Sequence, residues 1–193
     1  MSNKKGITGR EVARKILDKN GLKHVKVQAV EGVLSDHYDP RNKTVNLSPD
    51  IYDGESIAAI SVASHECGHA IQDKDGYLFL RIRSAIVPVV NLASKLGYIA
   101  IFAGIILGML GLFRIGIAME VVILVFQLIT LPVEFNASKR ALIKIKEYNI
   151  VTEDEHYYAK KMLTSAALTY VASVAATLVQ ILRFVLLFAS SDR

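Results

Sequence analysis

Three long stretches of apolar residues constrain the fold of this chain more than any other feature of its sequence. They cover residues 96–113, 115–133 and 162–189, and within them only Glu120 and Arg183 carry a charge. Each stretch is long enough to cross a hydrocarbon core roughly 30 Å thick as a helix. The alternative is a soluble bundle, but a chain of 193 residues has too little polar sequence to enclose three helices that are apolar all round. We therefore expect three transmembrane helices.

The sequence ahead of these stretches is polar and predicts a small α+β domain. Thr8 and Glu11 form a capping box at the start of an amphipathic helix that ends at Gly21. Segments 25–30 and 43–48 alternate well enough to be strands, and the turn-rich link between them predicts a hairpin with a long loop. A second helix is expected after these strands, and it ends before the polar sequence DKDG.

The predicted chain has four parts and makes an α-helical membrane protein with a small α+β domain. Residues 1–83 form a cytoplasmic domain with a helix at about 54–73. Residues 84–133 form a transmembrane hairpin, in which the short link GLFRIG joins the first two spans. Residues 134–161 form a second cytoplasmic segment, and residues 162–193 form the third transmembrane helix and a short tail.

The positions of the Lys and Arg residues predict how the chain crosses the membrane. Basic residues precede the first span and fill segment 134–161, whereas Arg114 and Arg193 lie at the opposite ends of the spans. The positive-inside rule then places the N-terminal domain and segment 134–161 in the cytoplasm and the C-terminus outside. The net charge of +5 forms no basic stripe interleaved with aromatic residues. It favours a lipid bilayer as partner and argues against nucleic acid.

Two further features bear on the cellular compartment. The single cysteine, Cys67, excludes an internal disulfide, so nothing indicates an oxidising environment. The first ten residues are polar and lack the apolar core of a signal peptide. The expected location is therefore a membrane whose polar protein segments face the cytoplasm.

The motif H-E-C-G-H at residues 65–69 lies on the C-terminal half of the predicted second helix. Residues four apart share a helix face, with Cβ atoms about 5–6 Å apart, so His65 and His69 can bind one zinc ion. Glu66 can reach a zinc-activated water and take its proton as the water attacks a peptide carbonyl. Gly68 leaves space beside the metal. The alternative is a helix that carries two exposed histidines.

A catalytic zinc ion needs a third protein ligand. Only two of the five histidines lie in the motif, and none of the others has a suitable spacing. Glu134, at the cytoplasmic end of the second apolar stretch, is the candidate, because a carboxylate at the edge of a transmembrane helix normally has a partner. The alternative is an interfacial glutamate paired with Arg140 or Lys139.

Several motifs resemble, in order along the chain, the YugP-type neutral zinc metallopeptidases, a bacterial membrane family. They are DHYDPRNKTV, IAAISVASHE, SHECGHAIQ, LPVEFNASKRA and AALTYVA. The resemblance extends from GREVARKIL to the last span, and it implies a zincin-like domain and one zinc per chain. It also implies that His65, His69 and Glu134 are the zinc ligands and that Glu66 is the base. The family usually starts with an N-terminal transmembrane helix, which has no counterpart in this chain.

The chain is similar, more distantly, to HtpX-type membrane proteases, which pair H-E-x-x-H with a later E-x-x-A-D. Glu134 fits this spacing, with Ser138 where that group has Asp. Where the neutral zinc metallopeptidases commonly have an apolar residue, this chain has Cys67. Because Cys67 is two positions from His65, we expect it to point away from the metal and to fill the core.

Four other residues are weaker candidates. Ser138 is one turn from Glu134 and is a candidate to orient a ligand, with a plain surface serine as the alternative. His37, before the second strand, is a candidate to contact substrate or the oxyanion, with a turn histidine as the alternative. Arg140 and Tyr170 are candidates to polarise the oxyanion, although Tyr170 also fits helix packing.

Together these features predict a membrane-anchored zinc-dependent endopeptidase in the bacterial cytoplasmic membrane, with a polypeptide substrate and an active site that faces the cytoplasm. Quality control of membrane proteins is the role that the analogy indicates. The alternative is a non-catalytic, zinc-stabilised membrane adaptor that binds proteins through a strand edge. The presence of Glu66 argues against it, because zinc binding needs only ligands. A third interpretation, an intramembrane protease, is disfavoured because the motif helix is short for a span and is flanked by acidic residues.

Overall fold

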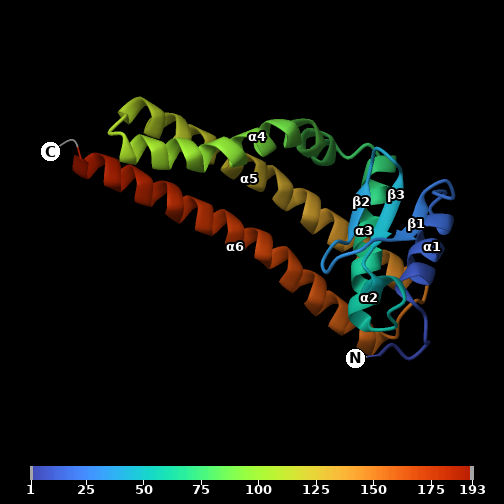
Figure 1. Ribbon diagram of the computed structural model, residues 1–193. Helices are drawn as coiled ribbons and strands as arrows, with labels where there is room; N and C mark the ends of the chain where they lie inside the picture. The colour runs from blue at the N-terminus through green and yellow to red at the C-terminus, as the bar shows by residue number, and fades with distance from the viewer. Residues whose placement is uncertain (1, 192–193) are drawn as a thin grey trace. The chain divides into compact units, whose positions relative to one another are not determined.

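The computed structural model describes residues 2–191, so Arg193, which entered the topology prediction, lies outside the described residues. The described chain is mostly helical and has one small sheet (Figure 1). In chain order the elements are α1 (Gly9–Lys19), β1 (Lys26–Ala29), β2 (His37–Asp39), β3 (Thr44–Leu47), α2 (Pro49–Tyr52), α3 (Ile57–Lys74), α4 (Leu78–Ile106), α5 (Leu110–Glu147) and α6 (Glu153–Ser191).

The chain divides into two compact units. The first unit comprises Met1–Tyr77 and Val133–Ala167, and the second comprises Leu78–Pro132 and Leu168–Arg193. The C-terminal part of α5 therefore belongs to the same unit as the polar N-terminal domain. The candidate ligands His65, His69 and Glu134 all lie in this first unit.

Helix α1 forms as the sequence predicts. The Thr8 hydroxyl accepts a hydrogen bond from the Glu11 backbone N–H, and the Glu11 carboxylate accepts one from the Thr8 backbone N–H. This reciprocal pair satisfies N–H groups that the first turn of a helix leaves free. Val12, Ile16 and Leu17 are fully buried and belong to the core of the first unit, where α1 packs against α3.

The sheet corrects one prediction. β1 and β3 do not form a hairpin, because they pair in parallel and the sheet order is β1-β3-β2. The turn-rich link between them contains β2, which pairs antiparallel with β3. The hairpin is therefore β2–β3, closed by residues 40–43. A link read only as turns hides this strand, because a three-residue strand is too short to show an alternating pattern.

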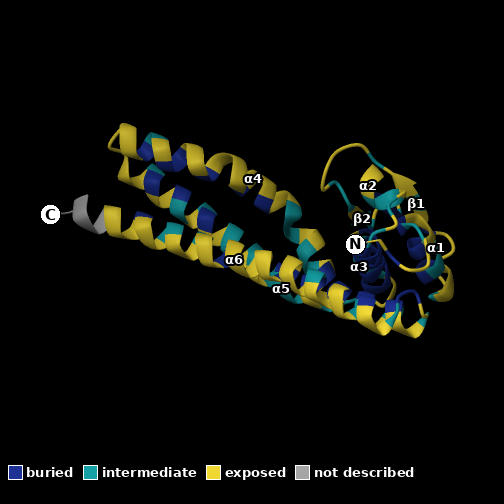
Figure 2. Cartoon of the chain, turned by 90° about the horizontal axis from the view of Figure 1, so that it is seen from below, coloured by how far each residue is buried: buried dark blue, intermediate teal, exposed yellow. Residues whose placement is uncertain are grey.

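Helix α3 lies at the centre of the first unit, close to the position predicted for the motif helix. Most of its residues are buried, and it is largely dark blue in Figure 2. Cys67 is fully buried in the core, with its Sγ 3.6 Å from the Ala13 carbonyl oxygen. Burial raises the pKa of this thiol, and the Glu66 charge raises it further. Cys67 is thus a core residue, as expected.

Helices α4, α5 and α6 are long and apolar enough to cross a membrane, which bears out the expectation of three apolar membrane helices. Most of their surface is exposed in the protein alone, and Figure 2 shows α4 and α6 largely in yellow. Among their exposed residues are Ile99, Phe102, Val179 and Leu186. Large apolar side chains at such positions are suited to contact with lipid.

The break between the first two apolar helices lies earlier than predicted. GLFRIG is inside α5, and the chain turns at residues 107–109. Gly108 has a φ of +63°, and the Met109 N–H donates to the Gly104 carbonyl oxygen at 2.9 Å, which is a glycine-terminated helix end. Arg114, the charged residue of GLFRIG, does not end the helix, because arginine is a good helix former. The expected spans 96–113 and 115–133 are corrected accordingly.

Candidate metal centre

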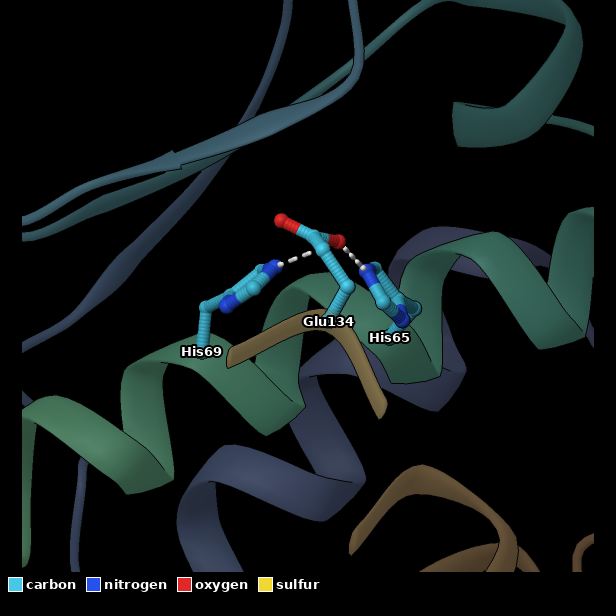
Figure 3. Close-up of side chains that lie close together, drawn as sticks. All are labelled: His65, His69 and Glu134. Atoms are coloured by element: carbon cyan, nitrogen blue, oxygen red, sulfur yellow. Dashed lines mark hydrogen bonds and ion pairs between the residues drawn. The ribbon is translucent and has the colours of Figure 1, made fainter. Parts of the chain in front are cut away.

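Three side chains that can bind a metal meet in the first unit (Figure 3). His65 and His69 project from one face of α3, and Glu134 projects from α5. Glu134 Oε2 lies 3.1 Å from His65 Nε2 and 3.6 Å from His69 Nε2. Glu134 is only 1% exposed and His69 only 7% exposed. The candidate donors therefore form a nearly buried cluster.

The geometry of these donors fits a zinc ion. The three donor atoms all lie within 4.8 Å of one another. Zinc bonds of about 2.0–2.1 Å in a tetrahedral arrangement place neighbouring donors about 3.3 Å apart. The two separations from Glu134 Oε2, 3.1 and 3.6 Å, lie on either side of this value. Two imidazoles and one carboxylate are also a donor set that zinc accepts, with a fourth position left open.

Gly68 explains how α5 comes close enough to supply the third donor. A Cβ atom at position 68 would lie 2.5 Å from the carbonyl oxygen of Ala137, which is closer than Cβ atoms in proteins come to other heavy atoms. The glycine of the motif therefore makes room for the α5 backbone. The sequence predicted that this space would lie beside the metal, and the structure instead fills it with the helix that carries Glu134.

Each histidine has a hydrogen-bonding partner at the ring nitrogen that faces away from Glu134. Ser138 Oγ lies 3.1 Å from His65 Nδ1, and Gln72 Oε1 lies 3.0 Å from His69 Nδ1. Such contacts orient an imidazole and leave its Nε2 available to a metal. Ser138 was among the weaker candidates from the sequence, and the structure brings it into this position. Its effect on metal binding stays a prediction.

The charge around His69 favours its protonated form in the metal-free chain. Burial by itself lowers the pKa of His69, but the Glu134 hydrogen bond, the charges of Glu66 and Glu134 and the Gln72 hydrogen bond together raise it. Glu66 is the residue after His65, is 7% exposed, and is near enough for its charge to act on His69. The charge of Glu66 thus acts on one of the three donors, and Glu66 itself is not among them.

The other sequence candidates lie in different surroundings. His37 is exposed on β2, with Nδ1 2.7 Å from the Ser35 carbonyl oxygen and Nε2 3.0 Å from Asn46 Nδ2, so protein groups engage both ring nitrogens. Arg140 donates to Asn136 and to Asp75. Tyr170 belongs to the second unit. The oxyanion or substrate roles of His37, Arg140 and Tyr170 stay predictions.

Sequence reasoning missed Gln72 and Asn136, which contact each other beside the donors. Gln72 is three residues after His69 on α3, and residues three apart on a helix are neighbours. A polar residue at this spacing from a candidate ligand was a usable signal. Asn136 had no such signal, because its contact with Gln72 depends on how α5 packs against α3.

Two histidines of an H-E-x-x-H helix and a carboxylate from a second helix are a donor set found in zinc metallopeptidases. The chain matches, over residues 1–189, the family described as "Putative neutral zinc metallopeptidase", and it belongs to that family. It is also 49% identical over 183 residues to the "Putative membrane protease YugP" of Bacillus subtilis (strain 168). The aligned region covers 95% of this chain and 81% of the relative. No solved structure matches the chain. The comparisons confirm the family that the motifs indicated.

Proposed function

We propose that this protein is a membrane-anchored zinc-dependent endopeptidase with one zinc site per chain, formed by His65, His69 and Glu134. The observation that carries the proposal is the meeting of these three donors in a nearly buried cluster, with Glu66 close enough for its charge to act on His69. A zinc ion held there would supply Lewis acidity, which activates water and polarises a carbonyl group. Family membership supports the same chemistry.

His65, His69 and Glu134 would hold the metal, and Glu66 would move a proton. His65 and His69 offer Nε2 and Glu134 offers Oε2, while Glu66 remains available as a base. No hydrogen bond to the Glu66 side chain is found within residues 2–191, so its carboxylate is not committed to another group. In the proposed reaction Glu66 accepts a proton from the attacking water and gives it to the departing amine.

The proposed substrate is an extended polypeptide. β2 lies at one edge of the sheet and packs near α3, the helix that carries the motif. A strand at a sheet edge has backbone N–H and C=O groups that a peptide can pair with as an added strand. Such pairing would hold the peptide beside the motif helix by its backbone, whatever its side chains.

The proposed setting is the bacterial cytoplasmic membrane, with a zincin-like domain and the metal site on the cytoplasmic side. The three apolar helices and the YugP similarity support attachment to a membrane. The side on which the domain lies is inferred from the basic residues near the spans. Cleavage of membrane proteins for quality control is the proposed physiological role, by analogy with membrane proteases.

The test measures two properties of the purified full-length protein in detergent: bound zinc per chain and cleavage of casein. We expect one zinc per chain, and cleavage that a chelator abolishes and added zinc restores. A protein that holds one zinc but cleaves neither casein nor an unfolded membrane protein would instead support the zinc-stabilised adaptor. A protein that binds no zinc would contradict both functions.

A further inference from the structure

Gln72 is the best-satisfied polar side chain around the candidate metal centre. It is 0% exposed, and its amide forms three contacts. Oε1 lies 3.0 Å from His69 Nδ1, while Nε2 lies 2.8 Å from the Val133 carbonyl oxygen and 3.0 Å from Asn136 Oδ1. Both N–H donors of the amide and one lone pair of its oxygen are therefore used. A fully buried amide this well paired has little freedom to turn.

The identity of each donor and acceptor follows from Arg140. A guanidinium group can only donate, so the Asn136 atom 2.8 Å from Arg140 Nε must be the amide oxygen. That oxygen also faces Gln72, so the Gln72 atom facing it must be the NH₂ group. The Val133 carbonyl oxygen, which can only accept, leads independently to the same orientation. The remaining Gln72 atom is then the oxygen, and His69 Nδ1 must donate a hydrogen bond to it.

This chain of contacts has a direct consequence for the metal site. An imidazole that carries its proton on Nδ1 presents the lone pair of Nε2 when it is neutral. Nε2 of His69 is the atom that lies 3.6 Å from Glu134 Oε2, in the donor cluster. In water a histidine side chain favours the opposite arrangement, with the proton on Nε2. When His69 is neutral, its hydrogen bond to Gln72 therefore selects the tautomer that can bind a metal at this position.

We propose that Arg140, Asn136 and Gln72 form a hydrogen-bond relay that holds the proton of His69 on Nδ1 and so directs Nε2 to the metal. The proposal deepens the proposed function and rests on the donor cluster named there. All members of the relay lie in the first unit, and Asp75 accepts a hydrogen bond from Arg140 at its outer end. In this view Arg140 is a positioning residue that acts from a distance, and the oxyanion role considered from the sequence is not needed to explain its placement.

The relay also connects the two helices that supply the donors. Gln72 is on α3, and Val133 and Asn136 are on α5, on either side of the ligand Glu134. Ser138 differs from Gln72, because its hydroxyl can either donate to or accept from His65 Nδ1. The contact with Ser138 therefore orients the His65 ring without selecting the position of its proton. His65 can serve as an internal reference when the relay is disturbed.

The first part of the test compares three full-length proteins loaded with zinc: the parent, Gln72→Met and Gln72→Glu. With ¹⁵N-labelled histidine, the chain gives signals from only five histidines. The readouts are the His69 Nδ1–H signal and the affinity for zinc in competition with a chelator. Glutamate keeps an acceptor for Nδ1–H but lacks the NH₂ group that faces Val133 and Asn136, whereas methionine has a similar size and offers neither.

We expect Gln72→Met to lose the protected His69 Nδ1–H signal and to bind zinc about 10–100-fold more weakly, the usual effect of removing a partner of a metal-bound histidine. Gln72→Glu should keep the His69 signal, and the His65 signals should not change in either variant. If Gln72→Met keeps the His69 Nδ1–H signal and the zinc affinity of the parent, Gln72 acts only through packing and the relay is wrong.

The second part tests the outer end of the relay with Arg140→Met and the matched control Lys139→Met. Lys139 is the neighbouring, exposed residue, and its replacement removes the same charge. We expect Arg140→Met to shift the His69 Nδ1–H signal and to weaken zinc binding several-fold, whereas Lys139→Met leaves both unchanged. Equal behaviour of the two variants would overturn the relay. If the parent binds zinc but cleaves nothing, only the proposed function fails, because these readouts do not use catalysis.

Discussion

Gly68 on α3 packs directly against the backbone of Ala137 on α5, where a Cβ atom would lie 2.5 Å from the Ala137 carbonyl oxygen. This contact sets how closely the helix with two candidate ligands approaches the helix with the third. In a closely packed interior such an overlap is relieved by moving a helix, since there is little empty space to take up the added atom. The contact therefore links one glycine of the motif to the position of Glu134.

Gly68→Ala is expected to weaken zinc binding by tenfold or more, an order-of-magnitude estimate based on the cost of overpacking a core, about 1–3 kcal/mol. The measurement is a competition between the protein and a chelator of known affinity. Gly111→Ala is the matched control, because no atom lies within 4 Å of a Cβ built at Gly111. Equal zinc affinity in the two variants would show that the approach of α5 does not depend on Gly68.

Glu66→Gln is expected to keep one zinc per chain and to lose peptidase activity. The amide has nearly the same size as the carboxylate but cannot accept the proton, and general base catalysis contributes about 10²–10⁴-fold. The assay is casein cleavage by the purified protein, with bound zinc measured on the same sample. Glu31→Gln, at an exposed loop position, is the control. Cleavage by Glu66→Gln at the rate of the parent would show that another group is the base.

The local part of this site could be predicted from the sequence, because it depends only on helix geometry. The positions of His65 and His69 on one face of α3 follow from a spacing of four residues. Glu134 was a candidate because a carboxylate at the end of an apolar stretch needs a partner. The relay through Gln72 and Asn136 could not be predicted, because it depends on the packing of α5 against α3.

The fold shows the same division between local and long-range features. The capping box of Thr8 and Glu11 and the three apolar helices depend on neighbouring residues, and the structure contains them. The parallel pairing of β1 with β3 joins segments separated by an unrecognised strand, and no local pattern indicated it. The turn at Gly108 was misplaced because a single glycine in an apolar stretch was read as part of a span.

Glu134→Ala is expected to lower zinc affinity by about a hundredfold or more, since partners of a ligand alone account for about 10–100-fold. Two histidines on one helix would remain, and they hold zinc too weakly for a catalytic site with three protein ligands. Glu147→Ala is the control, because Glu147 is on the same helix but is exposed and pairs with Lys144. Zinc binding by Glu134→Ala as tight as in the parent would exclude Glu134 as a ligand.

Zinc affinity is expected to fall as the pH is lowered, and the fall should begin above the usual histidine pKa of about 6.5. The raised pKa of His69 in the metal-free chain means that a proton competes with zinc at a higher pH than for a free imidazole. At high pH the ring is neutral and the competition disappears. Chelator competition across the neutral range measures the effect. An affinity that stays constant until the pH is well below 6.5 would contradict the assignment of His69.

The orientation in the membrane can be tested with single cysteines, because the native Cys67 is fully buried and its pKa is raised. A thiol in that state reacts slowly with maleimides, so it adds little background in the folded protein.

The two variants are Lys5→Cys, near the N-terminus, and Ser191→Cys, at the end of α6. A reagent that does not cross the membrane should label position 191 in intact cells and should label position 5 only after the cells are opened. This result follows from the basic residues that precede the first span and lie between the second and third, since such residues stay on the cytoplasmic side. Labelling of position 5 in intact cells would place the H-E-C-G-H helix, and with it the metal site, outside the cell.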